Sequence, residues 1–209
     1  MATAKRRAII FDIGRVLVRI DVGRAMATLG AGLSLSPAEL WSAIEKDPSW
    51  QDWQEGRISA RDWHLHLTRR LGTTLQFEQF THAWNQVLDP EPIQDDALFE
   101  TLKKTHRLAL LSNTDPIHVA YMEGHFGFFR YFPERARIYS CSFAASKPSP
   151  LLYLEALRAC KVQANKAVYI DDIEAYVEAA RSLGIAGITY RGREQLIEEL
   201  RVLGVEVPG

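Results

Sequence analysis

The sequence predicts an α/β fold, in which a doubly wound parallel sheet of five strands carries an inserted helical cap domain. Five short apolar runs occur along the chain, and helical patterns separate the later ones, which is typical of βαβ units. Each run is apolar at consecutive positions, so we expect both faces of each strand to be covered by helices. Residues 21–90, by contrast, hold helical patterns and no strand pattern.

The five strands are expected at residues 7–11, 107–112, 136–141, 166–170 and 186–190. Helices that cover the sheet are expected at residues 95–106, 149–160, 174–184 and 193–204. Because strand–helix–strand crossovers are right-handed, the first strand should lie in the middle, beside the second and the fourth. The predicted sheet is therefore Rossmann-like, with the strand order 3-2-1-4-5.

The inserted segment divides into four helical stretches, which start near residues 22, 36, 59 and 76. Ser36 and Glu39 have the spacing of a capping box. Ser59 is suited to begin a helix and Gly72 to end it. We therefore expect a four-helix cap domain and an α/β core domain, with a hinge at residues 89–96 between them. The cap takes residues 21–90, and the core takes residues 1–20 and 91–209.

Composition and charge argue against several classes of protein. The net charge is -1, which gives no electrostatic reason to expect nucleic acid or an anionic membrane as a partner. The apolar runs are too short to span a bilayer, and the one near the N-terminus meets Asp12 too soon for a signal peptide. Cys141 and Cys160 form neither a disulfide framework nor a metal-binding spacing. We expect a soluble, cytoplasmic protein, with no protein partner evident.

Polar residues stand where the predicted strands end. In an open α/β sheet, ligands bind at the carboxyl ends of the strands. The chain places three acids, a hydroxyl, an amide and a lysine at or after these ends, and the predicted strand order brings them together: Asp12, Ser112, Asn113, Lys147, Asp171 and Asp172.

This set of side chains suits phosphoryl transfer. Clustered carboxylates repel one another unless a hard cation lies among them, and Mg²⁺ takes oxygen ligands. Asp12 can act as a nucleophile that forms an aspartyl-phosphate, while Lys147 supplies positive charge to a phosphoryl oxygen. Ser112 and Asn113 can donate hydrogen bonds to phosphoryl oxygens. The sequence therefore predicts Mg²⁺ as cofactor and a small phosphorylated metabolite as substrate.

Four segments carry a family resemblance. "FDIGRVLV", "LLSNT", "SKPSP" and "YIDDIEAYVEAA" occur in the order and at the spacing of the four motifs of the haloacid dehalogenase superfamily, which they resemble. The inserted helices are similar to the α-helical cap of that superfamily. Within it, the chain resembles small bacterial phosphatases of sugar phosphates, such as α-glucose-1-phosphate phosphatases.

The resemblance implies a role for each matching residue. Asp12 would be the nucleophile and a ligand of Mg²⁺, and the main-chain carbonyl of Gly14 would be a second ligand. Ser112 would bind the phosphoryl group, and Lys147 would balance charge between that group and Asp12. One of the paired aspartates would complete the metal site, with Asp172 favoured and Asp171 bound or behind it.

The chain departs from the family pattern at Gly14. Phosphatases of the superfamily usually have an aspartate there, which serves as general acid and base, and its loss costs about 10²–10⁴-fold in rate if nothing replaces it. Two interpretations stay open. Either the enzyme is weak or inactive, or its substrate needs less help, as with the anomeric leaving group of a sugar 1-phosphate. His64 or His66 of the cap is a further candidate proton donor.

Two further residues lie at or beside the family motifs, and two others are candidates for substrate specificity. Tyr176 stands where the superfamily often has asparagine, and Arg15 adjoins the nucleophile motif, where it can reach an anionic substrate. Trp53 and Glu55, near a glycine-containing turn, are candidates for specificity.

Three functions remain in competition. The leading hypothesis is a Mg²⁺-dependent phosphatase. A 2-haloacid dehalogenase would use the same nucleophile without metal, which leaves the adjacent aspartates unexplained. A binding protein that keeps the fold without activity is the third, and Gly14 and Tyr176 are its support.

Overall fold

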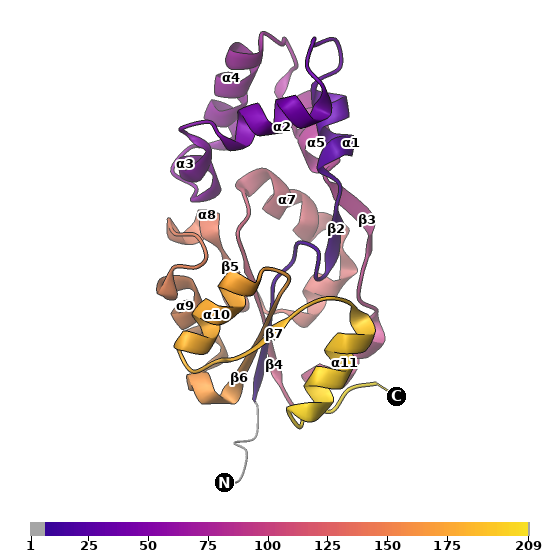
Figure 1. Cartoon of the computed structure of the whole chain (residues 1–209), viewed down its shortest axis with the longest axis vertical. Coiled ribbons are helices and arrows are strands. Elements are labelled where there is room, and N and C mark those ends of the chain that lie inside the picture. The colour runs from indigo at the N-terminus through magenta and orange to yellow at the C-terminus, as the bar shows by residue number, and fades with distance from the viewer. Residues whose placement is uncertain (1–6, 209) are drawn as a thin grey trace.

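The computed structural model describes residues 7–208, and the six predicted core residues before that range lie outside the described residues. Its main sheet has the order β5-β4-β1-β6-β7, so the predicted order 3-2-1-4-5 is confirmed (Figure 1). All four neighbouring pairs of strands are parallel. The strands are β1 (Ala8–Phe11), β4 (Arg107–Ser112), β5 (Arg137–Tyr139), β6 (Ala167–Asp171) and β7 (Ala186–Thr189).

Helices cover both faces of this sheet, as expected for a doubly wound fold. Alternate residues of β1 face opposite sides, so Ile9 and Phe11 join one core cluster while Ala8 and Ile10 join the other. The first cluster packs under α6 (Asp96–Lys103), α7 (Pro116–His125) and α11 (Arg193–Val202). The second packs under α9 (Pro150–Cys160) and α10 (Glu174–Ser182). Short helical turns fill the connections: η1 (Gly127–Tyr131), η2 (Glu134–Ala136), α8 (Ser140–Phe143) and η3 (Ala164–Lys166).

A separate group of helices, which we call the helical segment, lies beyond the carboxyl ends of the strands (Figure 1). It has a core in which three tryptophans and Phe80 pack with aliphatic side chains, including Ile117 of α7. The capping box of Ser36 and Glu39 is present, and so is the left-handed C-cap at Gly72. The members are α1 (Val22–Leu29), α2 (Pro37–Glu45), α3 (Trp50–Gln54), α4 (Ala60–Leu71) and α5 (Phe77–Asn85).

Two predictions about this segment need correction. It holds five helices rather than four, because α3 has only five residues and is too short to show a helical period. Leu88–Pro92, which crosses the predicted boundary at residue 90, forms strand β3 and pairs antiparallel with β2 (Val18–Ile20). Prolines and acids argue against a strand in general, yet they are tolerated in a two-stranded ribbon, where each strand is an edge. The ribbon joins the helical segment to the sheet.

No helix among the described residues has the length and apolar character needed to cross a membrane.

Candidate active site

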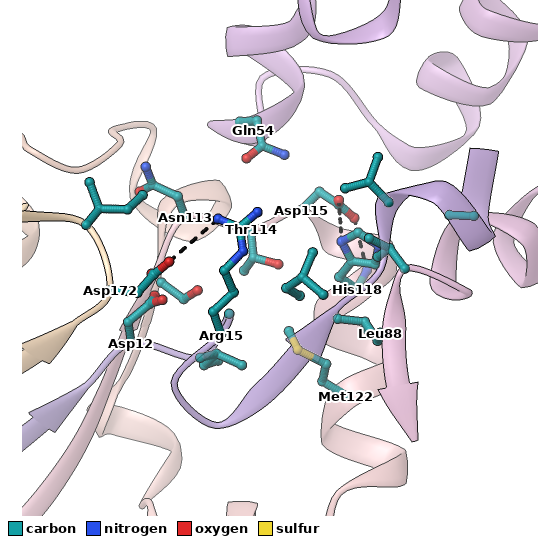
Figure 2. A pocket seen from close by; sticks show the side chains of 18 of the residues that line it. Asp12, Arg15, Gln54, Leu88, Asn113, Thr114, Asp115, His118, Met122 and Asp172 are labelled. Carbon is teal, nitrogen blue, oxygen red and sulfur yellow. Dashed lines mark hydrogen bonds and ion pairs between the residues drawn. The ribbon is translucent and has the colours of Figure 1, made fainter. Parts of the chain in front are cut away.

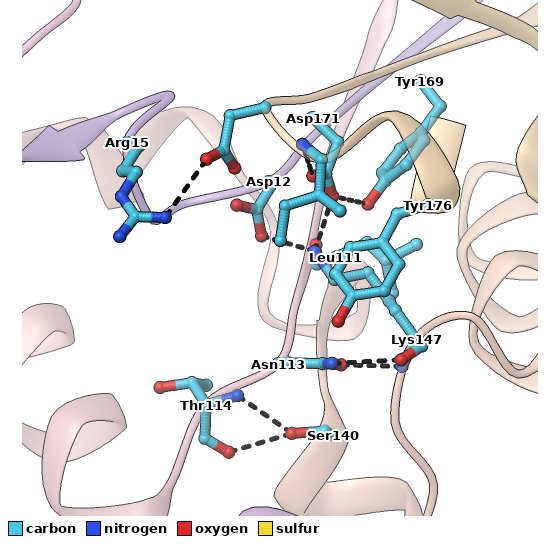
Figure 3. Close-up of polar contacts among 12 residues, drawn as sticks. Asp12, Arg15, Leu111, Asn113, Thr114, Ser140, Lys147, Tyr169, Asp171 and Tyr176 are labelled. Carbon is cyan, nitrogen blue, oxygen red and sulfur yellow. Dashed lines mark hydrogen bonds and ion pairs between the residues drawn. The ribbon is translucent and has the colours of Figure 1, made fainter. Parts of the chain in front are cut away.

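The register of the sheet brings the predicted residues together. Phe11 pairs with Leu110 on one side and with Ile170 on the other, so Asp12 follows β1 at the level where β4 and β6 also end. Ser112 is the last residue of β4, and Asp171 is the last of β6. Lys147 reaches the same point from the loop that precedes α9 (Figure 3).

Lys147 forms the centre of this group. Its Nζ lies 2.7 Å from Asp12 Oδ1 and 2.7 Å from Asp171 Oδ2, and all three side chains are buried. Burial alone would lower the pKa of Lys147, but the two carboxylates outweigh it and raise that pKa. Burial raises the pKa of Asp12 to about 6, in spite of the opposing charge of Lys147. The lysine therefore stays charged and holds the Asp12 carboxylate in a fixed orientation.

Two tyrosines flank the lysine. Nζ lies 5.0 Å from the ring centroid of Tyr176 and 5.9 Å from that of Tyr169, which places the cation against aromatic faces. The Tyr169 hydroxyl also donates to Asp171 Oδ2. Tyr176 thus presents its ring to the lysine.

The paired aspartates have different surroundings. Both carboxylate oxygens of Asp171 are engaged, since Oδ1 accepts from the main-chain N–H of Ile173 at 2.8 Å and Oδ2 accepts from Lys147 and Tyr169. The Asp172 side chain is 20% exposed, and one of its oxygens lies 3.6 Å from Arg15. Asp172 is therefore the more available of the two as a direct metal ligand.

The donor set fits Mg²⁺. Asp12, Asp171 and Asp172 each offer a carboxylate oxygen, and these oxygens lie within 4.8 Å of one another. Gly14 lines the same cavity. Oxygen ligands around a small site suit a hard divalent cation.

Gly14 is not required by packing. A Cβ at this position would lie 3.6 Å from Ile20 Cγ1 and 3.9 Å from Asp12 Oδ2, which are ordinary contacts, and the backbone is not left-handed. The fold therefore has room for a side chain beside the nucleophile. The absence of an acid/base carboxylate is a property of the sequence and not a steric necessity.

The loop after β4 organises the other side of the site. Asn113 Oδ1 accepts from the main-chain N–H of Lys147 at 2.7 Å, and its Nδ2 donates to the Lys147 carbonyl at 3.3 Å. The Thr114 N–H donates to Ser140 Oγ at 2.9 Å. Asn113 thus anchors the main chain that carries the lysine, while Ser112 lines the cavity.

A cavity of about 290 Å³ lies between the sheet edge and the helical segment. Figure 2 shows Asp12, Asn113 and Asp172 on one side, with Met122, Leu88 and His118 on the other, and the Arg15 side chain between them. We call the first side the charged half, and we call Met122, Leu88 and the facing helical segment the apolar half. His118 lies at the boundary between the two halves.

Four residues predicted as candidates in the helical segment do not line this cavity. His64 Nε2 lies 2.7 Å from the Leu75 carbonyl, and His66 Nε2 lies 2.9 Å from Asp47. The Trp53 ring stacks on Trp63, and Glu55 pairs with Arg57. All four serve packing or ion pairing within the segment, so His64 and His66 are not placed to protonate a leaving group.

The sequence analysis missed a cluster at the boundary of the two halves. Asp115 caps α7, accepts from Trp84 Nε1 at 3.0 Å and lies 2.8 Å from His118 Nδ1. His118 Nε2 lies 3.2 Å from the Trp84 carbonyl. Both partners of the ring are acceptors, which favours the imidazolium because it donates from both nitrogens. The Asp115–Pro116 pair before a helix was the available signal.

Comparisons with known proteins agree with this geometry. Residues 6–184 match the haloacid dehalogenase-like hydrolase family. A D-ribitol-5-phosphate phosphatase from Bacteroides thetaiotaomicron is 23% identical over 208 residues, covering 93% of this chain and 97% of that protein.

Two solved structures are also similar. A haloacid dehalogenase family enzyme from Bacteroides thetaiotaomicron, in complex with magnesium and inorganic phosphate, has a TM-score of 0.76 at 22% identity, covering 90% of this chain and 95% of that one. A predicted hydrolase of this type from Porphyromonas gingivalis has a TM-score of 0.77 at 25% identity, covering 97% and 100%. The magnesium in the first structure agrees with the predicted cofactor. This chain belongs to the haloacid dehalogenase-like hydrolase family.

Proposed function

We propose that the protein is a Mg²⁺-dependent phosphatase that hydrolyses a small phosphorylated metabolite through an aspartyl-phosphate. One observation carries the proposal: Lys147 holds Asp12 at 2.7 Å beside two further aspartates, at the floor of a cavity. A nucleophile, a fixed cation and a group of oxygen ligands are what phosphoryl transfer requires.

The proposed hydrolysis has two steps. The Asp12 carboxylate attacks phosphorus, and the bond from phosphorus to the leaving oxygen breaks. Water then attacks the aspartyl-phosphate and releases phosphate, which restores the carboxylate. Asp12, the Gly14 carbonyl and Asp172 would hold Mg²⁺, with Asp171 behind them, and the bound ion supplies positive charge to the phosphoryl oxygens.

Lys147 and Ser112 act on the phosphoryl group itself in this proposal. Lys147 would neutralise charge that develops between Asp12 and the phosphoryl oxygens, which its 2.7 Å contact with Asp12 supports. Ser112, which lines the cavity, would donate a hydrogen bond to one of these oxygens. Asn113 contributes as a positioning residue, since both polar atoms of its amide bind the main chain of Lys147.

A sugar phosphate remains a prediction for the substrate. Its support is the D-ribitol-5-phosphate on which the curated relative acts. Dehalogenation and a silent binding role also remain predictions. The grouped aspartates favour a metal-dependent reaction over dehalogenation, and Gly14 is the observation behind the silent role.

The test is phosphate release from a panel of phosphorylated metabolites, with Mg²⁺ or with EDTA. Release should require Mg²⁺ and should fall by about 10⁴-fold or more in Asp12→Asn, because the nucleophile is lost. Asp96→Asn, at a half-exposed aspartate of α6, is the matched control and should keep full activity. A folded protein that releases phosphate from no substrate, or one whose Asp12→Asn variant stays active, would contradict the proposal. Halide release without metal would establish the dehalogenase instead.

A further inference from the structure

Resting on the proposed function, we propose that the substrate is an aryl phosphate, whose aromatic leaving group occupies the apolar half of the cavity. Two independent observations carry this inference. The first is the chemistry of the cavity wall that faces the charged half. The second is the glycine at position 14.

The wall formed by the helical segment, Val87 and Leu88 is almost entirely apolar. Of the nine lining residues between positions 22 and 88, all of which the structure describes, eight are apolar and Gln54 alone is polar. Prominent among the eight are Met26, Trp41, Trp50, Trp84 and Leu88. A wall of this kind is suited to removing hydrocarbon from water and not to binding a row of hydroxyl groups.

The tryptophans add a preference for aromatic rings. The rings of Trp41 and Trp50 pack edge to face, with centroids 5.4 Å apart and planes at 88°, and Trp50 lies 6.3 Å from Trp84. Trp41 and Trp50 are both partly exposed, and both line the cavity. A further ring can extend this edge-to-face arrangement.

A sugar alcohol would find few partners here. Each hydroxyl that leaves water without a hydrogen-bond partner weakens binding, and Gln54 offers a single amide on that wall. The polar groups of the boundary cluster are already engaged, since Asp115 binds Trp84 and His118. The apolar half therefore discriminates against polyols.

Gly14 is compatible with an aryl phosphate from the reaction side, as it is with a sugar 1-phosphate. When Asp12 forms its bond to phosphorus, the electron pair of the breaking bond goes to the leaving oxygen. An alkoxide needs a proton from a general acid at this step, and position 14 supplies none. A phenol has a pKa of about 10, so a phenoxide leaves without that proton and takes one from water afterwards. Water next adds to phosphorus, the Asp12 carboxylate departs, and the remaining protons go to phosphate and solvent.

The test compares substrates whose leaving groups differ in polarity alone or in both polarity and acidity. Phenyl phosphate and 4-(carboxymethyl)phenyl phosphate have leaving groups of similar acidity, and only the first is apolar. D-Ribitol 5-phosphate has a polar leaving group that is also a poor one. We expect kcat/KM for phenyl phosphate to exceed that for each of the other two by about tenfold or more, which one unfavourable polar contact would produce. Equal or higher kcat/KM with D-ribitol 5-phosphate would overturn the inference and leave the phosphatase intact. No phosphate from any compound would overturn the proposed function itself.

A substitution in the apolar half tests whether this part of the cavity causes the preference for aryl phosphates. Met26→Gln keeps the approximate volume and adds an amide to the apolar half. It should raise KM for 2-naphthyl phosphate about tenfold with little change in kcat, because ring binding and not chemistry is affected. Leu65→Gln, on an exposed part of α4 away from the cavity, is the control and should change neither constant. An unchanged KM in Met26→Gln would count against the inference, and the comparison of substrates with the unaltered protein decides it if this variant fails to fold.

Discussion

The charged and apolar halves of the cavity are built in different ways. In the charged half, directed contacts near 2.7 Å fix Asp12, Lys147 and Asp171. The register of the parallel strands sets the positions of Asp12 and Asp171, and Lys147 reaches them from a loop. In the apolar half, side chains such as Met26 and Trp50 meet by packing, without directed bonds to one another. The reacting chemistry therefore depends on a rigid sheet edge, whereas selection of the leaving group depends on the shape of a helical wall.

The largest expected effect comes from removing the central cation. Lys147→Met leaves Asp12 and Asp171 buried without their partner, so we expect the free energy of unfolding to fall by about 3–5 kcal/mol at pH 7, together with loss of activity. The deficit should shrink at pH 5, because the pKa of Asp12 is about 6 beside Lys147 and higher without it, so that Asp12 is protonated in both proteins at pH 5. Urea denaturation at both pH values measures it. Lys103→Met, at a half-exposed lysine of α6, should leave stability nearly unchanged. An equal effect from both variants would contradict the contrast between the two halves.

A gain of function should follow from a carboxylate at position 14. Gly14→Asp fits without a close contact, and its side chain starts beside Asp12 Oδ2. We expect it to increase kcat on alkyl phosphates by about 10²-fold, the lower end for a general acid, and to change kcat on aryl phosphates little. Steady-state kinetics with both classes measures the difference. A uniform change for both classes would show that protonation of the leaving group does not limit the rate.

Gly56 tests the contact between the helical segment and the part of the molecule that carries the main sheet. It has φ +69, and a Cβ there would lie 2.0 Å from the Cys141 carbonyl oxygen. Nearby, the Ser140 hydroxyl lies 2.7 Å from the Gln54 carbonyl oxygen. Gly56→Ala should lower the free energy of unfolding by about 2–3 kcal/mol and raise KM, because the turn must move away from the sheet domain.

The Gly72→Ala variant separates the effect of backbone strain at a positive φ from the effect of a steric clash. Gly72 has φ +68, but nothing lies within 4 Å of its Cβ position. This variant should cost about 1 kcal/mol and leave KM unchanged. Identical effects of the two variants would mean that the docked turn does not shape the cavity.

A pH-dependent effect is expected in the cluster between the halves. The charge of Asp115 outweighs the burial of His118 and raises the pKa of the imidazole, while His118 lowers the pKa of Asp115 in spite of its burial. The contribution of His118 is fully present below pH 6.5 and is lost as the pH rises through its raised pKa, and that of Asp115 is present above pH 3.8. His118→Gln should therefore cost about 1–3 kcal/mol at pH 5.5 and less at pH 9.5, as thermal or urea unfolding would show.

His125→Gln, at an exposed position near the end of the same helix, is the control for this effect. It should give the same small change at both pH values. A pH-independent cost in His118→Gln would contradict the ion pair.

Much of this protein could be predicted from its sequence, and the reason is physical. A strand buried on both faces must be apolar along its length, so the five strands of the sheet are visible as runs, and crossover handedness then orders them. The residues directly after these runs, Asp12 and Ser112 among them, must meet at one edge. The charged half of the cavity therefore follows from local patterns and one topological rule.

Only the tertiary structure determines which residues form the apolar half. Trp41, Trp50 and Trp84 line the cavity, whereas Trp53 and Trp63 are fully buried and do not line it. No pattern in the sequence distinguishes these two groups of tryptophans. Likewise, the engagement of Asp171 by Tyr169 and Lys147 distinguishes it from Asp172, although the two are adjacent in sequence. Strand ends are placed by main-chain hydrogen bonds that a local pattern encodes, whereas a helical wall is placed by packing between segments far apart in the chain.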